Sequence, residues 1–290
     1  MGNKEHNGGF TNYRYDLRPR KILGIYSGDP LTEFSVPGME SLIALVKRDS
    51  TPEGEFLDKE TSLVFTSKLV DMHPYSSSKP TILTMKGYPI VDPYSYYGDY
   101  LSDPNFNRFN VVGTSLFSHE NLARRSERTL YGQMLTIARG AVLINKAVER
   151  SRETGQKIYV IAGSQGGTAA IYHALTSNGE DQADLYFPLT TTTDYSNGLL
   201  KSLLGRLTVN SRGKREKMQV YQNAFIRELP DDPILKEKMF PVISRADHVI
   251  PGQLKFWKGY QAAVIPWGHS TESAKFGKNI IPSWVLGHIS

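Results

Sequence analysis

Cysteine is absent from the 290-residue sequence, which excludes disulfide bonds, thiol catalysis and cysteine metal sites together. No apolar run approaches the roughly 20 residues that a membrane-spanning helix needs, so we expect no membrane span. The sequence also lacks His, Asp and Glu groupings with metal-ligand spacing, and it lacks a G-x-x-x-x-G-K-[ST] motif. We therefore expect a protein that works without a metal or another cofactor.

A strong excess of one charge is also missing. The formal net charge is +5, and the basic residues are scattered apart from small clusters at 124–125 and 212–217. This pattern favours a solvated basic face over a nucleic-acid-binding surface. With 39% hydrophobic and 22% charged residues, the composition is typical of an ordinary globular protein.

The first residues, 1–9, lack the apolar core of a signal peptide. His6 stands where a myristoylation signal would have Ser or Thr. A cytoplasmic protein is the default expectation, and secretion after removal of a leader is the alternative. Residues 1–20 are polar and glycine-rich, and we expect a flexible lead-in there, followed by a single domain over 21–290.

Apolar runs and helical spacing alternate along the chain, which predicts an α/β fold with a mostly parallel sheet. The opening strands suggest an antiparallel edge on that sheet. A long helix is expected at 130–149, ended by Gly155. The predicted strands are 21–26, 41–47, 62–70, 81–85, 108–116, 158–162, 184–189, one that starts at Met239 and a final one that starts at Gln261.

The stretch around Ser164 is the one on which the other predictions depend. The buried strand 158–162 stops at residues 163–167 (GSQGG), and a helix of small residues then runs to Leu175. Strand, glycine-framed serine and helix form the context in which G-x-S-x-G indicates a nucleophile elbow, a sharp turn that exposes the serine hydroxyl. A glycine-rich turn that binds phosphate is the alternative.

A second informative segment is residues 86–88 (Lys-Gly-Tyr), which follows the strand 81–85. In folds that carry an elbow, the loop after this strand donates the second backbone N–H to the oxyanion. We expect the amides of Gln165 and Tyr88 to hold the oxyanion, with Gly87 allowing the backbone to come close. A plain turn at the end of a strand is the alternative.

Two further residues complete a catalytic pattern. Asp247 comes just after one predicted strand and His269 just after the last one. Loops at the carboxyl ends of parallel strands meet at one edge of the sheet, where Ser164 is also expected. A serine needs an imidazole to take its proton and a carboxylate to orient that imidazole, and the chain order Ser, Asp, His fits this fold.

These segments resemble a known family. Gly-Ser-Gln-Gly-Gly, Asp-His-Val-Ile-Pro and Trp-Gly-His are similar to the elbow, acid-loop and histidine-loop segments of the α/β-hydrolase superfamily, over roughly residues 80–290. The resemblance implies a mostly parallel twisted sheet flanked by helices, with a small helical cap insertion. The Ser-Gln-Gly-Gly elbow resembles the acetyl-ester, dienelactone-hydrolase-like and acyl-thioesterase branches. Lys-Gly-Tyr departs from the His-Gly-Gly run of many lipases.

Other residues compete for the catalytic roles. Asp194 also follows a predicted strand and is the alternative acid, whereas His248 directly adjoins Asp247 and is poorly placed to pair with it. Ser118 and His119 are a rival nucleophile and base, although neighbours in sequence rarely face each other. The remaining histidines have no partner pattern, and we expect His173, inside the elbow helix, to pack or to face the surface.

Two segments could shape the site. Residues 194–238 are predicted to form an insertion, with helices near 199–207 and 215–229, that is either a lid or a helical excursion on the surface. The aromatic-rich segment 92–107 is either a substrate wall or, more commonly for such residues, packing on the sheet.

The sequence thus predicts a serine hydrolase that cleaves a small-molecule carboxylic ester through an acyl-enzyme. A peptidase, thioesterase or acyltransferase on the same triad is one alternative, since function depends on the grafted site. A non-catalytic binding protein of the same fold is another. No feature of the sequence predicts an oligomeric state.

Overall fold

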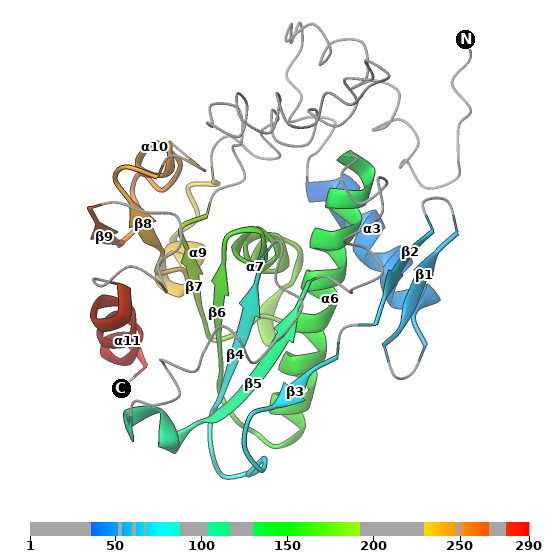
Figure 1. Ribbon diagram of the computed structural model, residues 1–290, viewed down its shortest axis with the longest axis horizontal. Coiled ribbons are helices and arrows are strands. Elements are labelled where there is room, and N and C mark those ends of the chain that lie inside the picture. The colour runs from blue at the N-terminus through cyan, green and yellow to red at the C-terminus, as the bar shows by residue number, and fades with distance from the viewer. Residues whose placement is uncertain are drawn as a thin grey trace, which may run out of the picture.

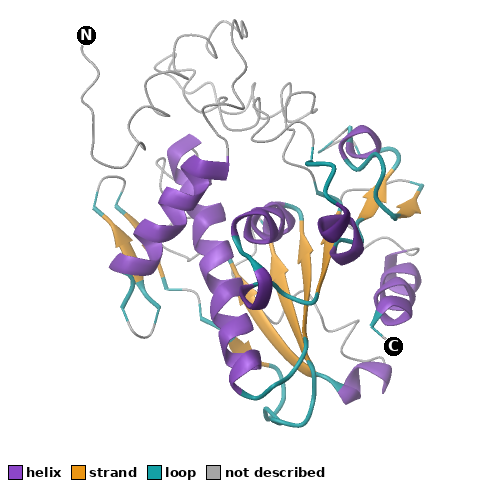
Figure 2. Cartoon of the chain, turned by 180° about the vertical axis from the view of Figure 1, so that it is seen from behind, coloured by secondary structure: helices purple, strands orange, loops and turns teal. Residues whose placement is uncertain are grey.

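The computed structural model describes residues 36–51, 54–59, 62–66, 68–87, 104–116, 130–191, 229–247, 250, 252–266 and 277–289. At its centre is a twisted sheet with helices on both faces (Figure 1). From behind, helices α6 (Leu130–Glu153) and α7 (Gln165–Thr176) cover one face, with α3 (Val36–Asp49) beside them (Figure 2). Helix α11 (Gly277–His288) packs on the opposite face.

Seven strands of the described residues form the central sheet, in the order β3-β5-β4-β6-β7-β8-β9. All neighbouring pairs are parallel except β3 and β5, which are antiparallel. The structure therefore confirms the mostly parallel sheet and its antiparallel edge. The strands are β3 (Val70–Asp71), β4 (Thr81–Lys86), β5 (Asn110–Ser115), β6 (Ile158–Gly163), β7 (Leu185–Leu189), β8 (Val242–Ser244) and β9 (Ala263–Ile265).

Successive residues of the central strands face opposite sides of the sheet, as the pleat requires. In β6, Val160 and Ala162 pack in the core under α6 and α7, whereas Tyr159 and Ile161 pack in the core that includes α11. Because both faces are covered, every residue of β6 is buried. This is why the strand appears in the sequence as an uninterrupted apolar run.

Residues 41–47 form part of a helix, so the strand predicted there is wrong. Within α3, Leu42 and Val46 are fully buried in the core with α6, while Ala44 and Lys47 are exposed. Burial at a spacing of four residues is the pattern of an amphipathic helix, which a short apolar run does not distinguish from a buried strand. Pro37 lies in the first turn, where proline favours helix initiation.

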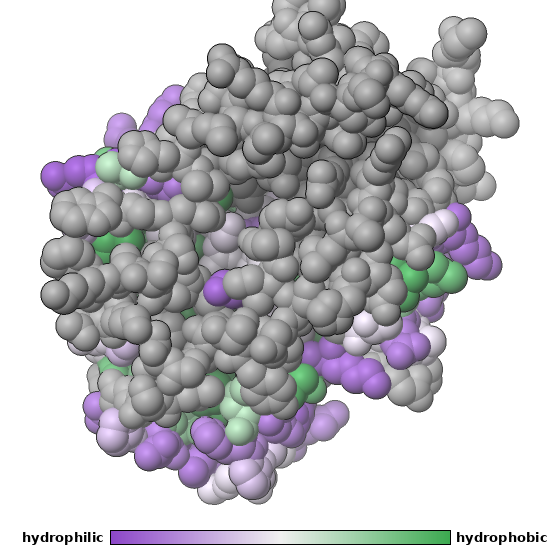
Figure 3. Space-filling view, in the orientation of Figure 1, coloured by the Kyte–Doolittle hydropathy of each residue, from purple (hydrophilic) through white to green (hydrophobic). Residues whose placement is uncertain are grey.

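The predicted strand 62–70 is two strands in different sheets. β2 (Leu63–Phe65) pairs with β1 (Phe56–Asp58) as a separate antiparallel hairpin, whereas β3 is an edge strand of the central sheet. Apolar side chains reach the surface at the hairpin, where Leu57 is 55% exposed (Figure 3). The long helix is confirmed and extends to Glu153, beyond the predicted end, and the Gly155 backbone has φ 67° after it.

Several predicted segments lie outside the described residues. These are the lead-in 1–20, the strand 21–26, most of the aromatic segment 92–107 and most of the insertion 194–238. Of the aromatic segment, Phe106 is buried and its ring centroid is 6.3 Å from that of Phe109, so this residue packs on the sheet. Of the insertion, the structure describes its end, including the short helix α9 (Pro233–Lys238). None of the described helices is both long enough and apolar enough to span a bilayer.

His173 is part of α7, and its side chain lies in the core rather than at the surface, with 2% of its area exposed. Its Nδ1 is 2.8 Å from the Tyr186 hydroxyl, which also accepts a hydrogen bond from the Ala183 backbone N–H at 2.9 Å. Burial, and to a smaller extent the positive charge of Lys47, lowers the pKa of His173 to about 3. The imidazole is therefore neutral in the folded protein at physiological pH.

This neutral histidine should make the fold sensitive to acid. The folded-state pKa of His173 lies below the unfolded value of about 6.5. The stability that the neutral imidazole contributes is therefore fully present above pH 6.5 and is lost as the pH falls towards 3. Between pH 7.5 and pH 5, where few carboxyl groups titrate, His173 should account for a loss of about 2 kcal/mol in the free energy of unfolding.

Urea unfolding of the wild type and of His173→Gln across this pH range would give the slope of the free energy of unfolding against pH for each protein, and the wild type should have the steeper slope. Equal slopes in the two proteins would contradict the prediction. As a measurement that needs no variant, the His173 Cε1–H resonance of the wild type should not shift between pH 7.5 and pH 5.

Candidate active site

Ser164 occupies a strained turn between β6 and α7. Its backbone dihedral angles are φ 51° and ψ −123°, outside the regions that residues with a Cβ normally adopt. The Ser164 N–H donates to the Leu189 carbonyl at 2.9 Å, and the Ser164 carbonyl accepts from the Thr191 hydroxyl at 2.5 Å. A strained residue held by its neighbours is characteristic of a functional turn, and the half-buried Ser164 side chain lies at the carboxyl end of β6.

The residues around Ser164 leave no room for larger side chains. A Cβ on Gly166 would lie 2.9 Å from the Met85 carbonyl oxygen, and one on Gly167 would lie 2.4 Å from Cγ2 of Thr191. The residue two positions before the serine is the fully buried Ala162, so the sequence is an A-x-S-x-G form of the motif rather than a strict G-x-S-x-G. Small residues on both sides let strand and helix approach each other, as the elbow requires.

Gly87, the residue after β4, lies directly against this turn. A Cβ on Gly87 would lie 2.7 Å from the Gln165 backbone nitrogen and 3.1 Å from the Ser164 Cβ. Gln165 begins α7, and backbone N–H groups at a helix N-terminus stabilise negative charge. The structure therefore brings Gly87, Ser164 and Gln165 together, which is the arrangement that an oxyanion site needs. Tyr88 lies outside the described residues.

Asp247 is buried just beyond the end of β8, as the sequence predicted for its position. Its Oδ1 accepts from the Ile250 backbone N–H at 2.9 Å, and its Oδ2 accepts from Nε2 of Gln253 at 2.6 Å. Only 3% of the Asp247 surface is exposed. A carboxylate with this little solvent needs such hydrogen bonds, and they fix the orientation of the group.

His269 lies outside the described residues, as do the alternative acid Asp194 and the histidines His119 and His248. The strand before His269 is described: β9 pairs in parallel with β8, with Ile265 opposite Ser244. The chain therefore leaves β9 at the same edge of the sheet from which Asp247 leaves β8. The role of His269 stays a prediction.

Three residues that the sequence did not single out support the site. Buried Gln253 on α10 (Gln253–Phe256) donates to Asp247 and accepts from the Ser244 backbone N–H at 2.9 Å. Thr191, fully buried, bonds the Ser164 carbonyl, and Nε1 of Trp257 donates to the Thr191 carbonyl at 2.8 Å. Thr191 and Ser164 are 27 residues apart in the sequence, and Trp257 and Thr191 are 66 apart, so no local pattern could have predicted these two contacts.

The comparisons with known proteins bear on the fold. No protein-family model matches the sequence, and neither does any curated protein. Among solved structures, a protein described as a "putative hydrolase" from Agrobacterium vitis S4 has a TM-score of 0.52 at 12% identity, covering 77% of this chain and 93% of that one. A protein of unknown function from Staphylococcus aureus subsp. aureus Mu50 has a TM-score of 0.50 at 8% identity, covering 81% and 97%. Est1E from Butyrivibrio proteoclasticus has a TM-score of 0.49 at 13% identity, covering 80% and 97%.

The chain has the α/β-hydrolase fold, as the sequence predicted. The mostly parallel sheet with helices on both faces agrees with the likeness to these structures. At these identities the likeness concerns the fold, and the chemistry has to be argued from the residues of the site.

Proposed function

We propose that this protein is a serine hydrolase that cleaves a carboxylic ester through an acyl-enzyme. The observation that carries the proposal is the backbone of Ser164, with φ 51° and ψ −123° at the junction of β6 and α7. A side chain so placed projects from the carboxyl edge of the sheet, where an α/β-hydrolase has its nucleophile. That the Agrobacterium vitis protein is described as a "putative hydrolase" is consistent with this proposal.

The proposed reaction uses the residues in separate roles. Ser164 attacks the ester carbonyl while His269 accepts the hydroxyl proton, and Asp247 orients and stabilises the imidazolium. The backbone amides of Gln165 and Tyr88 hold the oxyanion, and Gly87 permits the close approach of the second amide. Each such donor contributes about 3 kcal/mol to transition-state stabilisation in comparable enzymes. His269 then returns the proton to the leaving alcohol, and water hydrolyses the acyl-Ser164 bond.

The geometry of Ser164 and Asp247 supports an activated serine, but it does not select one class of substrate. A peptidase, thioesterase or acyltransferase would use the same residues. We place the ester first because the Ser-Gln-Gly-Gly elbow resembles esterase branches of the superfamily. A panel of acyl esters, thioesters and peptides tested on one enzyme preparation would rank these substrates.

Labelling with a fluorophosphonate probe tests the proposal. The probe should form a stoichiometric adduct, and peptide mapping should place it on Ser164. An activated nucleophile reacts through its base, so His269→Ala should lose the adduct while remaining folded. A well-folded wild-type protein that takes no label, or takes it at another serine, would contradict the proposed mechanism.

A further inference from the structure

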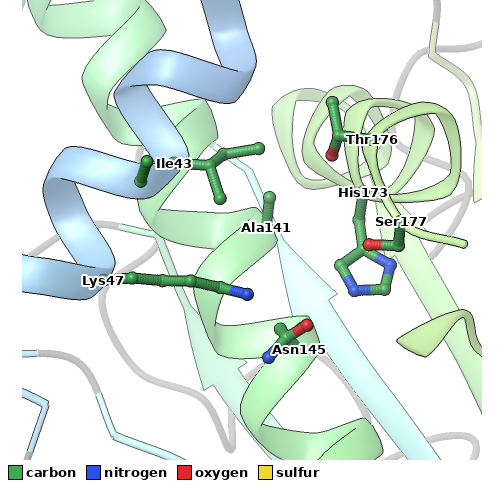
Figure 4. Close-up of a pocket in the computed structure, with 8 residues that line it drawn as sticks. Ile43, Lys47, Ala141, Asn145, His173, Thr176 and Ser177 are labelled. Atoms are coloured by element: carbon green, nitrogen blue, oxygen red, sulfur yellow. The ribbon is translucent and has the colours of Figure 1, made fainter.

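A pocket lies at the opposite end of α7 from Ser164. A cavity of about 180 Å³ opens between α3, α6 and the last turn of α7 (Figure 4). Its apolar wall includes Ile43 and Ala141, and its polar side includes Lys47, Asn145 and His173. Ser164 and His173 are nine residues apart, which is about 14 Å along a helix, so the pocket is separate from the proposed active site.

The His173 side chain presents a hydrogen-bond donor to this pocket. The Tyr186 hydroxyl accepts the Ala183 N–H, and its own proton finds a partner when Nδ1 of His173 is the acceptor. In that arrangement the ring proton of His173 is on Nε2. Nε2 has no hydrogen-bond partner within the described part of the chain, although the side chain is almost wholly buried. A buried N–H without a partner is costly, and it indicates that the pocket normally holds an acceptor.

Lys47 adds a positive charge to the same pocket. Its side chain extends from α3 towards Asn145 and the His173 ring (Figure 4). None of the carboxylates that the structure describes forms an ion pair with Lys47. The nearest acidic group on α6, Glu149, accepts a hydrogen bond from the Asn145 amide. A ligand that enters therefore meets an imidazole N–H and an ammonium group, both of which are donors only.

We propose that this pocket binds a small carboxylate with a short apolar chain. One carboxylate oxygen accepts from Nε2–H of His173 and the other from the Lys47 ammonium, while the chain packs against Ile43 and Ala141. The cavity has room for about six water-sized groups, which matches a ligand of about six non-hydrogen atoms. The site stands on α3, α6 and the end of α7, and it does not depend on whether Ser164 is a nucleophile.

Titration with sodium butyrate, followed by NMR of the His173 side chain, tests this site. The ring nitrogen shifts of the free protein should show a protonated Nε2. Butyrate should then shift the His173 resonances saturably, with a Kd of about 1–10 mM. Butyramide, which has the same shape without the charge, should bind at least about 5-fold more weakly.

Two variants on α3 provide a matched comparison. Lys47→Gln should weaken butyrate binding about 5- to 10-fold. Arg48→Gln removes the same charge from the next residue, which is exposed and paired with Asp49, and it should leave binding unchanged. Equal weakening in the two variants would show a general charge effect and overturn the proposal. So would His173 shifts that sodium chloride reproduces, or the absence of saturable shifts up to about 100 mM butyrate.

Discussion

Ser164→Ala is expected to lower kcat for an activated ester by about 10⁵- to 10⁶-fold, which is below the detection limit of an ordinary turnover assay. Alanine lacks the hydroxyl that attacks the carbonyl, so only the oxyanion site and substrate binding remain to accelerate hydrolysis by water. The strained backbone at φ 51° should persist, because serine and alanine both carry a Cβ. The free energy of unfolding should therefore change little, and loss of activity would not reflect loss of the fold.

Ser151→Ala is the matched control for this experiment. Ser151 is buried near the end of α6, and its hydroxyl has no hydrogen-bond partner within the described residues. This variant loses the same atom away from the carboxyl edge of the sheet and should keep wild-type turnover. Initial rates and urea unfolding curves of the three proteins give both quantities. Substantial turnover by Ser164→Ala would show that another group is the nucleophile.

The sequence predicted the centre of the fold well because the strands there are buried on both faces. β6 is an uninterrupted apolar run, and all residues of β4 except its last, Lys86, are buried. The glycines after Ser164 mark the turn by their lack of side chains. Towards the edges the local pattern was ambiguous. The run 41–47 suits a buried strand or the buried side of a helix equally, and contacts of Leu42 and Val46 with α6 decide in favour of the helix.

The supporting residues of the site could not be predicted, for a different reason. Gln253 and Thr191 are ordinary polar residues whose importance comes from partners brought near by the fold, namely the Asp247 carboxylate and the Ser164 carbonyl. The same holds for His173, because its position in a helix does not predict its contact with the Tyr186 hydroxyl on β7. The chemistry of single residues was enough to propose Ser164 and Asp247 from the sequence, but the groups that hydrogen-bond to them are seen only in the tertiary structure.

Asp247→Asn should lower kcat about 10³- to 10⁴-fold, because an amide cannot stabilise the imidazolium and can hold the wrong tautomer of His269. It should also lower the free energy of unfolding by about 1–3 kcal/mol. Both Asp247 oxygens accept hydrogen bonds, from the Ile250 N–H and from Gln253. Asparagine has only one acceptor oxygen, and its NH₂ group would face a donor. Gln253 cannot simply rotate its amide, because its oxygen accepts from the Ser244 N–H.

Asp184→Asn separates the catalytic effect from the structural one. Asp184 also orders the backbone, since its Oδ2 accepts from the Ile158 N–H at 2.8 Å and from Arg152 at 3.0 Å, but it lies at the opposite edge of the sheet from Ser164. Its amide variant should lose stability and keep turnover. Rates measured below the unfolding temperature of each protein, with the folded fraction determined by circular dichroism, make the comparison. If folded Asp247→Asn stays within about 10-fold of wild type, the carboxylate is not the triad acid, and Asp194 becomes the residue to replace next.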